Sequence, residues 1–378
     1  MLGDLNGQPV KRERDRSDGL EGVVAADTVL SEVDGRAGRL VIRGCSLDQL
    51  SGRVSFEAVV HRLLDGFFEN LPDADKLSAA LGRSRVEAFG EIAALDEGLG
   101  RLTTTEAVRA LMARLPDGDD LATALRLIAA PAVFTPAVAR ARRGLAAVSP
   151  DPTLGHAADI LRMLKDRPAT PAEAAGLDAY LVTVCDHGLN ASTFAARVVA
   201  STRAGLTSAA LAGISALKGP LHGGAPGPVI EMLDEIGRPE NARAWLEAAL
   251  ARGDRLMGFG HRVYRVRDPR ADALKKAVRM MSEASNVTPG RLAFAEAVEA
   301  AALAILKARK PDRSLQTNVE FYTALLLESL AFPAAAFTCV FAMGRVAGWI
   351  AHAREQQASG RLIRPQSRYI GPIPLSAA

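Results

Sequence analysis

The chain has 378 residues, of which 48% are hydrophobic, 5% aromatic and 24% charged, and its formal net charge is +3. This length allows two domains and a sizeable core, and the dominance of alanine, leucine and valine favours packed helices over sheets. The small net charge, without an RNP-like motif or zinc-ligand spacing, argues against a nucleic-acid partner.

The N-terminus and the cysteines bear on the compartment. Residues 1–18 are polar and lack the apolar segment of a secretory signal, so we expect a flexible lead-in there. The three cysteines, Cys45, Cys185 and Cys339, lie far apart without CxxC spacing. This pattern favours a reducing, cytoplasmic environment over a disulfide framework.

One apolar stretch, 331–351, has the length of a membrane span. Pro333 and Arg345 interrupt it, and an arginine at the centre of a bilayer is costly. We therefore expect a buried helix and no membrane association.

The first predicted element is a small β-hairpin. The apolar runs 23–26 and 40–42 flank the turn signal Asp-Gly-Arg at 34–36. This hairpin is expected to be the only notable sheet.

Helical periodicity follows from Ser55 onward, and the fold class is predicted as all-α. Leu77, Leu81 and Val86 are expected to share the buried face of one helix. Thr-Pro-Ala-Glu at 170–173 is a helix-start signature. Further helices are expected from 105, at 121–128, 136–147, 171–187, 206–217, 228–236, 239–252, 269–285, 291–309 and 319–330, and beyond 333.

Another predicted helix is capped by Asn190, and its residues Phe194, Val198 and Val199 are expected to be buried.

Three of the six histidines stand at helix breaks between 185 and 322. His187 ends a predicted helix and could hold an anionic substrate, or it could be a C-terminal histidine favoured by the helix dipole. His222 lies in Lys-Gly-Pro-Leu-His-Gly-Gly-Ala at 218–225, where glycines would let a substrate approach the backbone. His261 follows the glycine loop 258–260.

That glycine loop lacks both a preceding strand and the third glycine of the dinucleotide fingerprint, so a Rossmann site is excluded. The arginines after it indicate an anionic ligand with carboxylates or phosphates, or a solvated basic face. These arginines are Arg262, Arg265, Arg267 and Arg270.

Two later arginines and one acid complete the candidates. Arg345 lies within an apolar helix and requires an anionic partner. With Arg364 and Arg270 it could clamp a dicarboxylate, although each could instead form a structural ion pair. Glu320 lies in the first turn of a helix, where the dipole favours its ionised form. It could serve as a base, or it could be an ordinary glutamate at a helix N-terminus.

In combination these segments resemble the citrate synthase family. The resemblance runs from 19–25 to 364–372, and the blocks 189–198, 218–225 and 260–270 match in order and spacing. Several long blocks in sequence make this signal far more specific than any single motif.

The resemblance implies an all-α homodimer with two domains and a small N-terminal β-hairpin. Residues 19–221 and 323–378 would form a large domain, and 222–322 a small domain that closes over the site. The implied reaction condenses acetyl-CoA with oxaloacetate and then hydrolyses citryl-CoA, without a metal or a permanently bound cofactor.

The resemblance also implies a role for each candidate residue. His187 matches the histidine that binds oxaloacetate, His222 the one that hydrogen-bonds the thioester carbonyl, and His261 the one that polarises the ketone. The carboxylate clamp would be Arg270, Arg345 and Arg364, with Arg364 supplied by the partner subunit. CoA would contact Arg265, Gly258 and Gly260.

One position departs from the family pattern, which most often has aspartate as the base in Asn-Val-Asp-Phe. This chain has Glu320, one methylene longer. We expect the backbone to be withdrawn to compensate. Two alternatives stay open: a 2-methylcitrate synthase that uses propionyl-CoA, and a non-catalytic sensor of oxaloacetate or CoA on the same scaffold.

Overall fold

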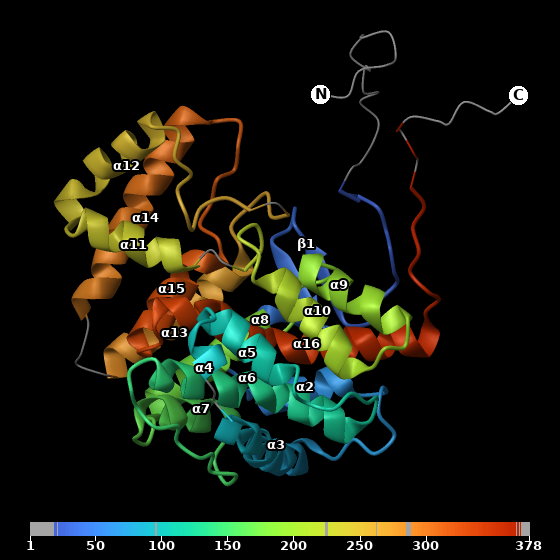
Figure 1. Ribbon diagram of the computed structural model, residues 1–378. Helices are drawn as coiled ribbons and strands as arrows, with labels where there is room; N and C mark the ends of the chain where they lie inside the picture. Colours follow the sequence, from blue (N-terminus) through green and yellow to red (C-terminus); the bar gives the residue numbers. More distant parts are fainter. Residues whose placement is uncertain are drawn as a thin grey trace, which may run out of the picture.

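The computed structural model describes residues 19, 20, 22–94, 97–223, 226–261, 263–284, 289–367, 369 and 371, and its framework is helical (Figure 1). The predicted lead-in at 1–18 lies outside these residues. The first half of the chain forms α1 (Leu47–Leu50), α2 (Phe56–Leu64), α3 (Ala74–Phe89), η1 (Gly90–Ala94), α4 (Glu97–Gly100), α5 (Thr104–Met112), α6 (Leu121–Ala141), α7 (His156–Lys165) and α8 (Pro171–Val184). The second half forms α9 (Ala191–Ser201), α10 (Leu206–Leu217), α11 (Pro226–Ile236), η2 (Pro239–Asn241), α12 (Ala242–Ala251), α13 (Pro269–Ala284), α14 (Pro289–Arg309), α15 (Val319–Ser329), η3 (Ala334–Ala336) and α16 (Phe337–Ser359).

A small antiparallel sheet precedes the helices, as expected, but its first strand is not 23–26. The strands are β1 (Ser31–Asp34), β2 (Arg39–Ile42) and β3 (Cys45–Ser46), in the order β1-β2-β3. The Asp34 carboxylate accepts hydrogen bonds from two turn amides, and Asp34 pairs with Arg39. Because this tight turn sets the register, the residues directly before it form the strand.

The long apolar helix α6 corrects a second expectation. Residues 121–128 and 136–147 were predicted as two helices, but 121–141 is one helix with Pro131 and Pro136 inside it. Each proline removes one backbone hydrogen bond. The helix continues because it is almost entirely buried against α3, α5, α7 and α16, and this packing outweighs the lost bonds.

Helix α3 buries an arginine in place of the expected valine. Leu77 and Leu81 are buried as predicted, but Val86 is 47% exposed. Arg85 takes the inward position and its Nε donates to the buried Asp159 of α7 at 2.8 Å. The ion pair therefore joins α3 to α7. Apolar periodicity alone predicted that Val86, the next residue, would take the buried position.

Helices α8 and α16 lie near the centre of the molecule, where α9 packs on α16 and α15 packs on α8 (Figure 1). Two glycines on α16 allow α8 to approach closely. A Cβ atom on Gly344 would lie 2.8 Å from the Leu181 carbonyl oxygen, and one on Gly348 would lie 2.3 Å from the Cys185 carbonyl oxygen. This close packing brings the C-terminal end of α8 beside the polar residues of α16.

Helices α11, α12 and α14 gather at one side of the molecule, away from α3, α6 and α7 (Figure 1). They meet the centre through α15, on which α11 packs, and through α13, which packs on both α8 and α15. The loop after α12 and the start of α15 thus lie at the junction between this group and the rest.

Two described helices are long and apolar enough to cross a membrane by length and composition, Leu121–Ala141 and Ala334–Ala358. In the fold, 83% and 78% of their apolar windows are buried. Core helices of soluble proteins meet the same criterion, so these helices are weak support for a membrane span.

Helix α9 has the expected asparagine cap, since the Asn190 side chain accepts from the amides of Ser192 and Thr193. Its apolar residues are only partly covered, however. Phe194, Val198 and Val199, expected to be buried, are half-buried because no element of the described chain covers that face completely.

Candidate active site

The candidate residues His187, His261 and Arg270 are brought together around Tyr264. The ring centroids of His187 and His261 are 5.9 Å apart, and His187 Nε2 lies 3.1 Å from the Tyr264 hydroxyl. The Arg270 guanidinium lies 5.8 Å from the centre of the Tyr264 ring. Residues from the end of α8, the loop at 258–268 and the start of α13 therefore meet at one place.

The glycine loop is held against the segment that begins α15. Phe259 and Thr317 form an isolated antiparallel bridge. The Gly260 amide donates to the Gln316 carbonyl at 2.7 Å, and the Asn318 amide donates to the Gly258 carbonyl at 3.0 Å. This pairing fixes His261 and the first turn of α15 relative to each other.

Both glycines of this loop have positive φ, +85° at Gly258 and +81° at Gly260, which is strained for other residues. A Cβ on Gly258 would also lie 2.9 Å from the Phe321 ring. Backbone groups of both glycines form hydrogen bonds with residues 316–318. The expected contact of these glycines with CoA remains a prediction, and it would depend on the shape of the loop.

The His261 ring is oriented by backbone. Its Nδ1 atom accepts from the amides of Val263 and Tyr264, each at 3.0 Å. In the neutral ring the proton is then on Nε2, which lies 3.1 Å from Arg270 Nη2. Burial, reinforced by the charge of Arg270, lowers the pKa of His261 to about 4. Two donors side by side suit an acceptor oxygen that would bind both.

Arg270 is aimed by a carboxylate that sequence analysis missed. Its Nε and Nη2 atoms donate to the two oxygens of Asp268 at 3.0 and 2.8 Å. Burial disfavours the cation, but Asp268 outweighs burial and the pKa of Arg270 is raised. The same carboxylate accepts from the Val319 amide at 3.2 Å, so Asp268 joins Arg270 to the start of α15.

His187 is 9% exposed, and burial lowers its pKa well below the ordinary value. The charges of Arg270 and Arg345 lower the pKa further. His187 is therefore neutral near pH 7 and can hold a ligand through a hydrogen bond without adding a charge.

His222 meets a second group of polar side chains that sequence analysis also missed. Its Nε2 atom lies 2.8 Å from Ser192 Oγ. The same hydroxyl accepts from Trp349 Nε1 at 3.1 Å and lies 2.8 Å from Asn190 Oδ1. Burial lowers the pKa of His222 to about 4, and Arg345 and Arg270 contribute.

The single Ser192 proton can go to Asn190 or to His222, but not to both. When it is donated to His222 Nε2, the ring carries its own proton on Nδ1, which is then free to donate to a ligand. The neutral ring and its serine partner thus form an arrangement suited to stabilising a developing oxyanion.

Arg345 is nearly fully buried and only partly satisfied. Its Nε donates to the Val184 carbonyl at 2.6 Å, and its guanidinium lies 4.8 Å from the Phe341 ring centre. Its Nη2 atom has no partner among the described residues. Burial lowers the pKa of Arg345 to about 10, so it is still a cation at neutral pH. A buried cationic donor without a partner is suited to bind an anionic ligand.

Glu320 is in the first turn of α15, where its amide donates to the cap Asn318 at 3.2 Å. Its Oε2 atom is buried without a partner among the described residues. Burial raises the pKa of Glu320, while the charge of Arg270 opposes that rise. A carboxylate with raised basicity and a free oxygen can act as a general base. The buried Tyr180 hydroxyl, also without a described partner, is influenced by the charges of Arg345, Glu320 and Arg270.

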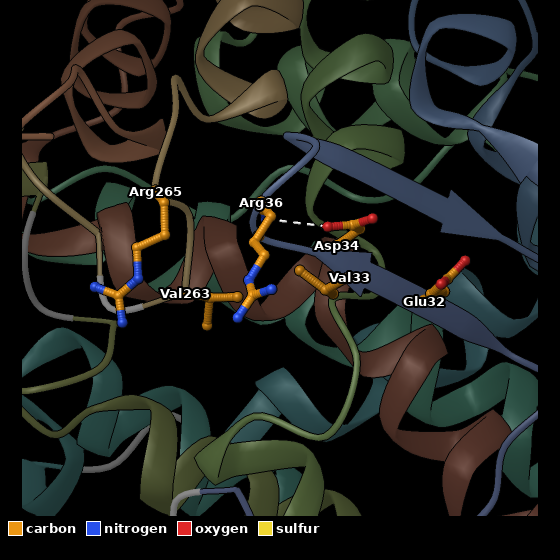
Figure 2. A pocket seen from close by; sticks show the side chains of 7 residues that line it. Glu32, Val33, Asp34, Arg36, Val263 and Arg265 are labelled. Carbon is orange, nitrogen blue, oxygen red and sulfur yellow. Dashed lines mark hydrogen bonds between the residues drawn. The ribbon is translucent and has the colours of Figure 1, made fainter.

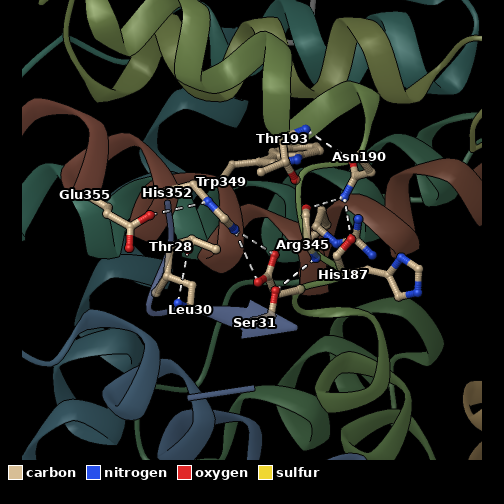
Figure 3. Close-up of polar contacts among 12 residues, drawn as sticks. Thr28, Leu30, Ser31, His187, Asn190, Thr193, Arg345, Trp349, His352 and Glu355 are labelled. Atoms are coloured by element: carbon tan, nitrogen blue, oxygen red, sulfur yellow. Dashed lines mark hydrogen bonds and ion pairs between the residues drawn. The ribbon is translucent and has the colours of Figure 1, made fainter. Parts of the chain in front are cut away.

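A buried polar network lies behind His187 (Figure 3). His352 Nδ1 accepts from Arg197 at 2.9 Å, and its Nε2 lies 3.3 Å from Asp186 Oδ2. Arg197 also donates to Glu355 at 2.5 Å. This network ties α9 and α16 to the residue directly before His187.

Three expected arginines do not join this cluster in the described subunit. Arg364 is exposed, and its neighbour Ile363 is held by Ser201 at the C-terminal end of α9, whereas Ser192 lies at the other end. Arg265 is exposed on the rim. Arg267 pairs with Asp272 and Glu299, the structural alternative. Arg262 lies outside the described residues, as do residues 224–225 of the His222 segment.

The missed residues had weak local signals. Asp268 stands two residues before Arg270 at a helix start, and Ser192 follows the Asn190 cap by two. The partners of Ser192 and Asp186 on α16 are more than 150 positions away, since Trp349 and Ser192 are separated by 157 and His352 and Asp186 by 166. No local pattern predicts such pairs.

Comparisons with known proteins agree with the geometry. The family model for the citrate synthase C-terminal domain matches residues 19–366. The chain is 39% identical over 366 residues to the putative citrate synthase 2 of Mycobacterium tuberculosis strain H37Rv, covering 95% of this chain and 94% of that protein. It is 36% identical over 376 residues to the 2-methylcitrate synthase of the same strain, covering 96% and 93%.

Among solved structures, a similar one is the ternary complex of carboxymethyl coenzyme A and oxaloacetate with citrate synthase from Thermoplasma acidophilum. Its TM-score is 0.83 at 28% identity, and the match covers 96% of this chain and 98% of that one. With the family model spanning nearly the whole chain and relatives above 30% identity, the chain belongs to the citrate synthase family.

Proposed function

We propose that this chain condenses acetyl-CoA with oxaloacetate and water to give citrate and CoA. The observation that carries the proposal is a pair of oppositely charged buried groups without partners among the described residues, Arg345 Nη2 and Glu320 Oε2. The charges of both groups affect the pKa of the buried Tyr180 hydroxyl, which Arg345 lowers and Glu320 raises. A dianionic substrate would accept a hydrogen bond from the unpaired Arg345 Nη2, and an acidic C–H group of a second substrate would supply the proton that the Glu320 carboxylate removes.

Oxaloacetate would bind where donors converge. Its carboxylates would be held by Arg345 and Arg270, with Arg364 of the partner subunit as the third arginine. His187 adds a neutral donor. The ketone oxygen would accept from His261 Nε2, whose proton position is supported by the two amides at Nδ1. These contacts would orient the substrate and make its carbonyl carbon electrophilic.

The carbon–carbon bond would form in two coupled steps. Glu320 removes a proton from the acetyl methyl group while His222 donates to the thioester oxygen, which stabilises the enolate as it develops. The enolate carbon attacks the ketone carbon, and the ketone oxygen takes a proton from His261. The product of this step is citryl-CoA.

Hydrolysis then completes the reaction. Water attacks the citryl thioester carbon, the carbon–sulfur bond breaks, and CoA leaves as the thiol with citrate as the other product. Exclusion of water before bond formation would limit wasteful hydrolysis of acetyl-CoA. Closure of a small domain, 222–322, over a large domain, 19–221 and 323–378, would provide that exclusion. The loop after α12 and the first turn of α15 lie at the junction between the group of α11, α12 and α14 and the rest of the molecule. Their position supports this division.

A homodimer is part of the proposal. The half-buried apolar residues Phe194 and Val198 on α9 support a partner surface there. Ile363 is anchored about 14 Å along α9 from Ser192, at 1.5 Å per helical residue, so Arg364 is better placed to serve a partner's site than its own. The free thiols of all three cysteines support a cytoplasmic location.

The test compares acyl donors. CoA thiol release is measured with oxaloacetate and either acetyl-CoA or propionyl-CoA. The proposal requires oxaloacetate-dependent release with a higher kcat/KM for acetyl-CoA. A higher value for propionyl-CoA would make the protein a 2-methylcitrate synthase, and binding without release from either donor would make it a sensor.

A further inference from the structure

An open pocket of about 420 Å³ lies between the β1–β2 turn and the loop that follows His261 (Figure 2). It is lined by Glu32, Val33, Asp34, Gly35, Arg36, Val263 and Arg265. The side chains of Arg36 and Arg265 point to the same side of the pocket, with Val263 between them. Arg265 carries an expected CoA contact, whereas Arg36 takes no part in the proposed reaction.

The two walls of this pocket rest directly on each other. The Arg265 amide donates to the Gly35 carbonyl at 2.8 Å. A Cβ on Gly35 would lie 2.3 Å from the Val263 carbonyl oxygen, and one on Gly38 would lie 2.7 Å from the Val266 side chain. Glycine at these turn positions therefore permits backbone contact, which holds Arg36 beside Arg265.

The acids of the pocket are already engaged, whereas the two arginines are not. Glu32 pairs with Arg39 at 3.2 Å. Asp34 accepts from the turn amides of Arg36 and Ala37 at 3.0 and 2.9 Å. Among the described residues, neither Arg36 nor Arg265 forms an ion pair. The pocket thus presents two guanidinium groups outside any ion pair, although the charge of Arg36 also acts on Asp34. Two such groups suit a polyanion.

We propose that Arg36 and Arg265 together bind the phosphate groups of the CoA nucleotide, which makes Arg36 an additional binding residue for the acyl-CoA substrate. The inference rests on the proposed function. Arg265 follows His261 by four residues, so the pocket lies at the rim of the candidate active site. The exposed Val263 side chain between the guanidiniums, 44% accessible, offers an apolar surface for the adenine ring. Each guanidinium can bind phosphate oxygens through two parallel hydrogen bonds.

A consequence follows for the contact between turn and loop. A ligand that bridges Arg36 on the turn and Arg265 on the loop stabilises the arrangement in which the two segments touch. Since the turn belongs to the proposed large domain and the loop to the proposed small one, CoA would itself favour the closed arrangement.

The test measures CoA binding by isothermal titration calorimetry to the full chain and to two variants, Arg36→Gln and Arg53→Gln. Arg53 is a matched control, because it is an exposed arginine that does not line the pocket. We expect Arg36→Gln to weaken CoA binding roughly tenfold by loss of a charge-assisted contact. The control should stay within about twofold, as is usual for a substitution at an exposed position. Oxaloacetate binding should be the same in both variants.

Equal CoA affinity in the two variants, or no CoA binding by the unaltered chain, would overturn the assignment of Arg36. CoA binding that depends on Arg36 without turnover of acetyl-CoA would uphold the pocket and remove the proposed reaction. Turnover by the unaltered chain with an acetyl-CoA KM that does not change in Arg36→Gln would do the reverse.

Discussion

Shortening the candidate base tests whether the site is built for glutamate. Glu320→Asp retains the carboxylate and its charge but removes one methylene. The start of α15 cannot easily move to compensate, because it is held by three hydrogen bonds. Asn318 donates from its amide to Gly258 at 3.0 Å and from its side chain to Gly260 at 2.8 Å, and the Val319 amide donates to Asp268 at 3.2 Å.

The magnitude follows from this fixed backbone. The carboxylate would be withdrawn by about 1.5 Å, the length of one carbon–carbon bond. A displacement of this size from a reacting proton costs on the order of 100-fold in rate, which corresponds to about 2.7 kcal/mol in the barrier. We expect kcat to fall by that factor. The KM for oxaloacetate should change little, because its proposed ligands are unaltered.

The assay is steady-state release of the CoA thiol at saturating oxaloacetate, with Glu320→Gln as the inactive reference. The Gln variant keeps the length of the side chain and loses only the basic oxygen, so its turnover should be abolished while oxaloacetate still binds. If Glu320→Asp were as fast as the unaltered enzyme, or faster, the backbone would not be adapted to glutamate.

Three further outcomes are expected. Ser192→Ala should lower kcat roughly tenfold or more, because the partner that orients the His222 ring is lost; an unchanged kcat with a raised oxaloacetate KM would contradict that role. Since burial raises the pKa of Glu320 and the base works only when ionised, kcat should fall as pH drops through that raised pKa. His222 and His261, with pKa values lowered to about 4, are neutral above that pH and should add no second limb near neutral pH; a loss of kcat as pH rises from neutral would show that a protonated group is required and would contradict the neutral state of these histidines. Arg85→Ala should reduce the free energy of unfolding by about 2–3 kcal/mol in urea denaturation, because Asp159 loses its fully buried partner and keeps only Arg162, at 2.8 Å; a loss below about 1 kcal/mol, the range of an exposed pair, would contradict the buried pairing.

Local patterns predicted the helices well where one physical cause dominated. The capping box at 170–173 begins α8 as expected, with Thr170 and Glu173 bonding to each other's backbone amides. Prediction failed where tertiary packing outweighed local preference. Helix α6 continues through Pro131 because neighbours cover it on every side, and Arg85 takes a core position because Asp159 is opposite it.

The candidate site was predictable as a set of residue types but not as a geometry. Histidines beside glycines and the isolated Arg345 indicated chemistry from sequence alone. The groups that aim them come from distant positions, such as Trp349 beside Ser192 and Asp268 joining Arg270 to α15. Only the folded chain brings these groups together, and residue spacing in the sequence does not predict their contacts.

The proposed reaction is tested most directly by oxaloacetate-dependent CoA release from acetyl-CoA, measured on the unaltered chain and on Glu320→Gln under the same conditions, with oxaloacetate binding to both followed by calorimetry. We expect release by the unaltered chain, none by the variant, and binding by both. Full release by Glu320→Gln would remove Glu320 as the base, and binding without any release by the unaltered chain would contradict the proposed reaction.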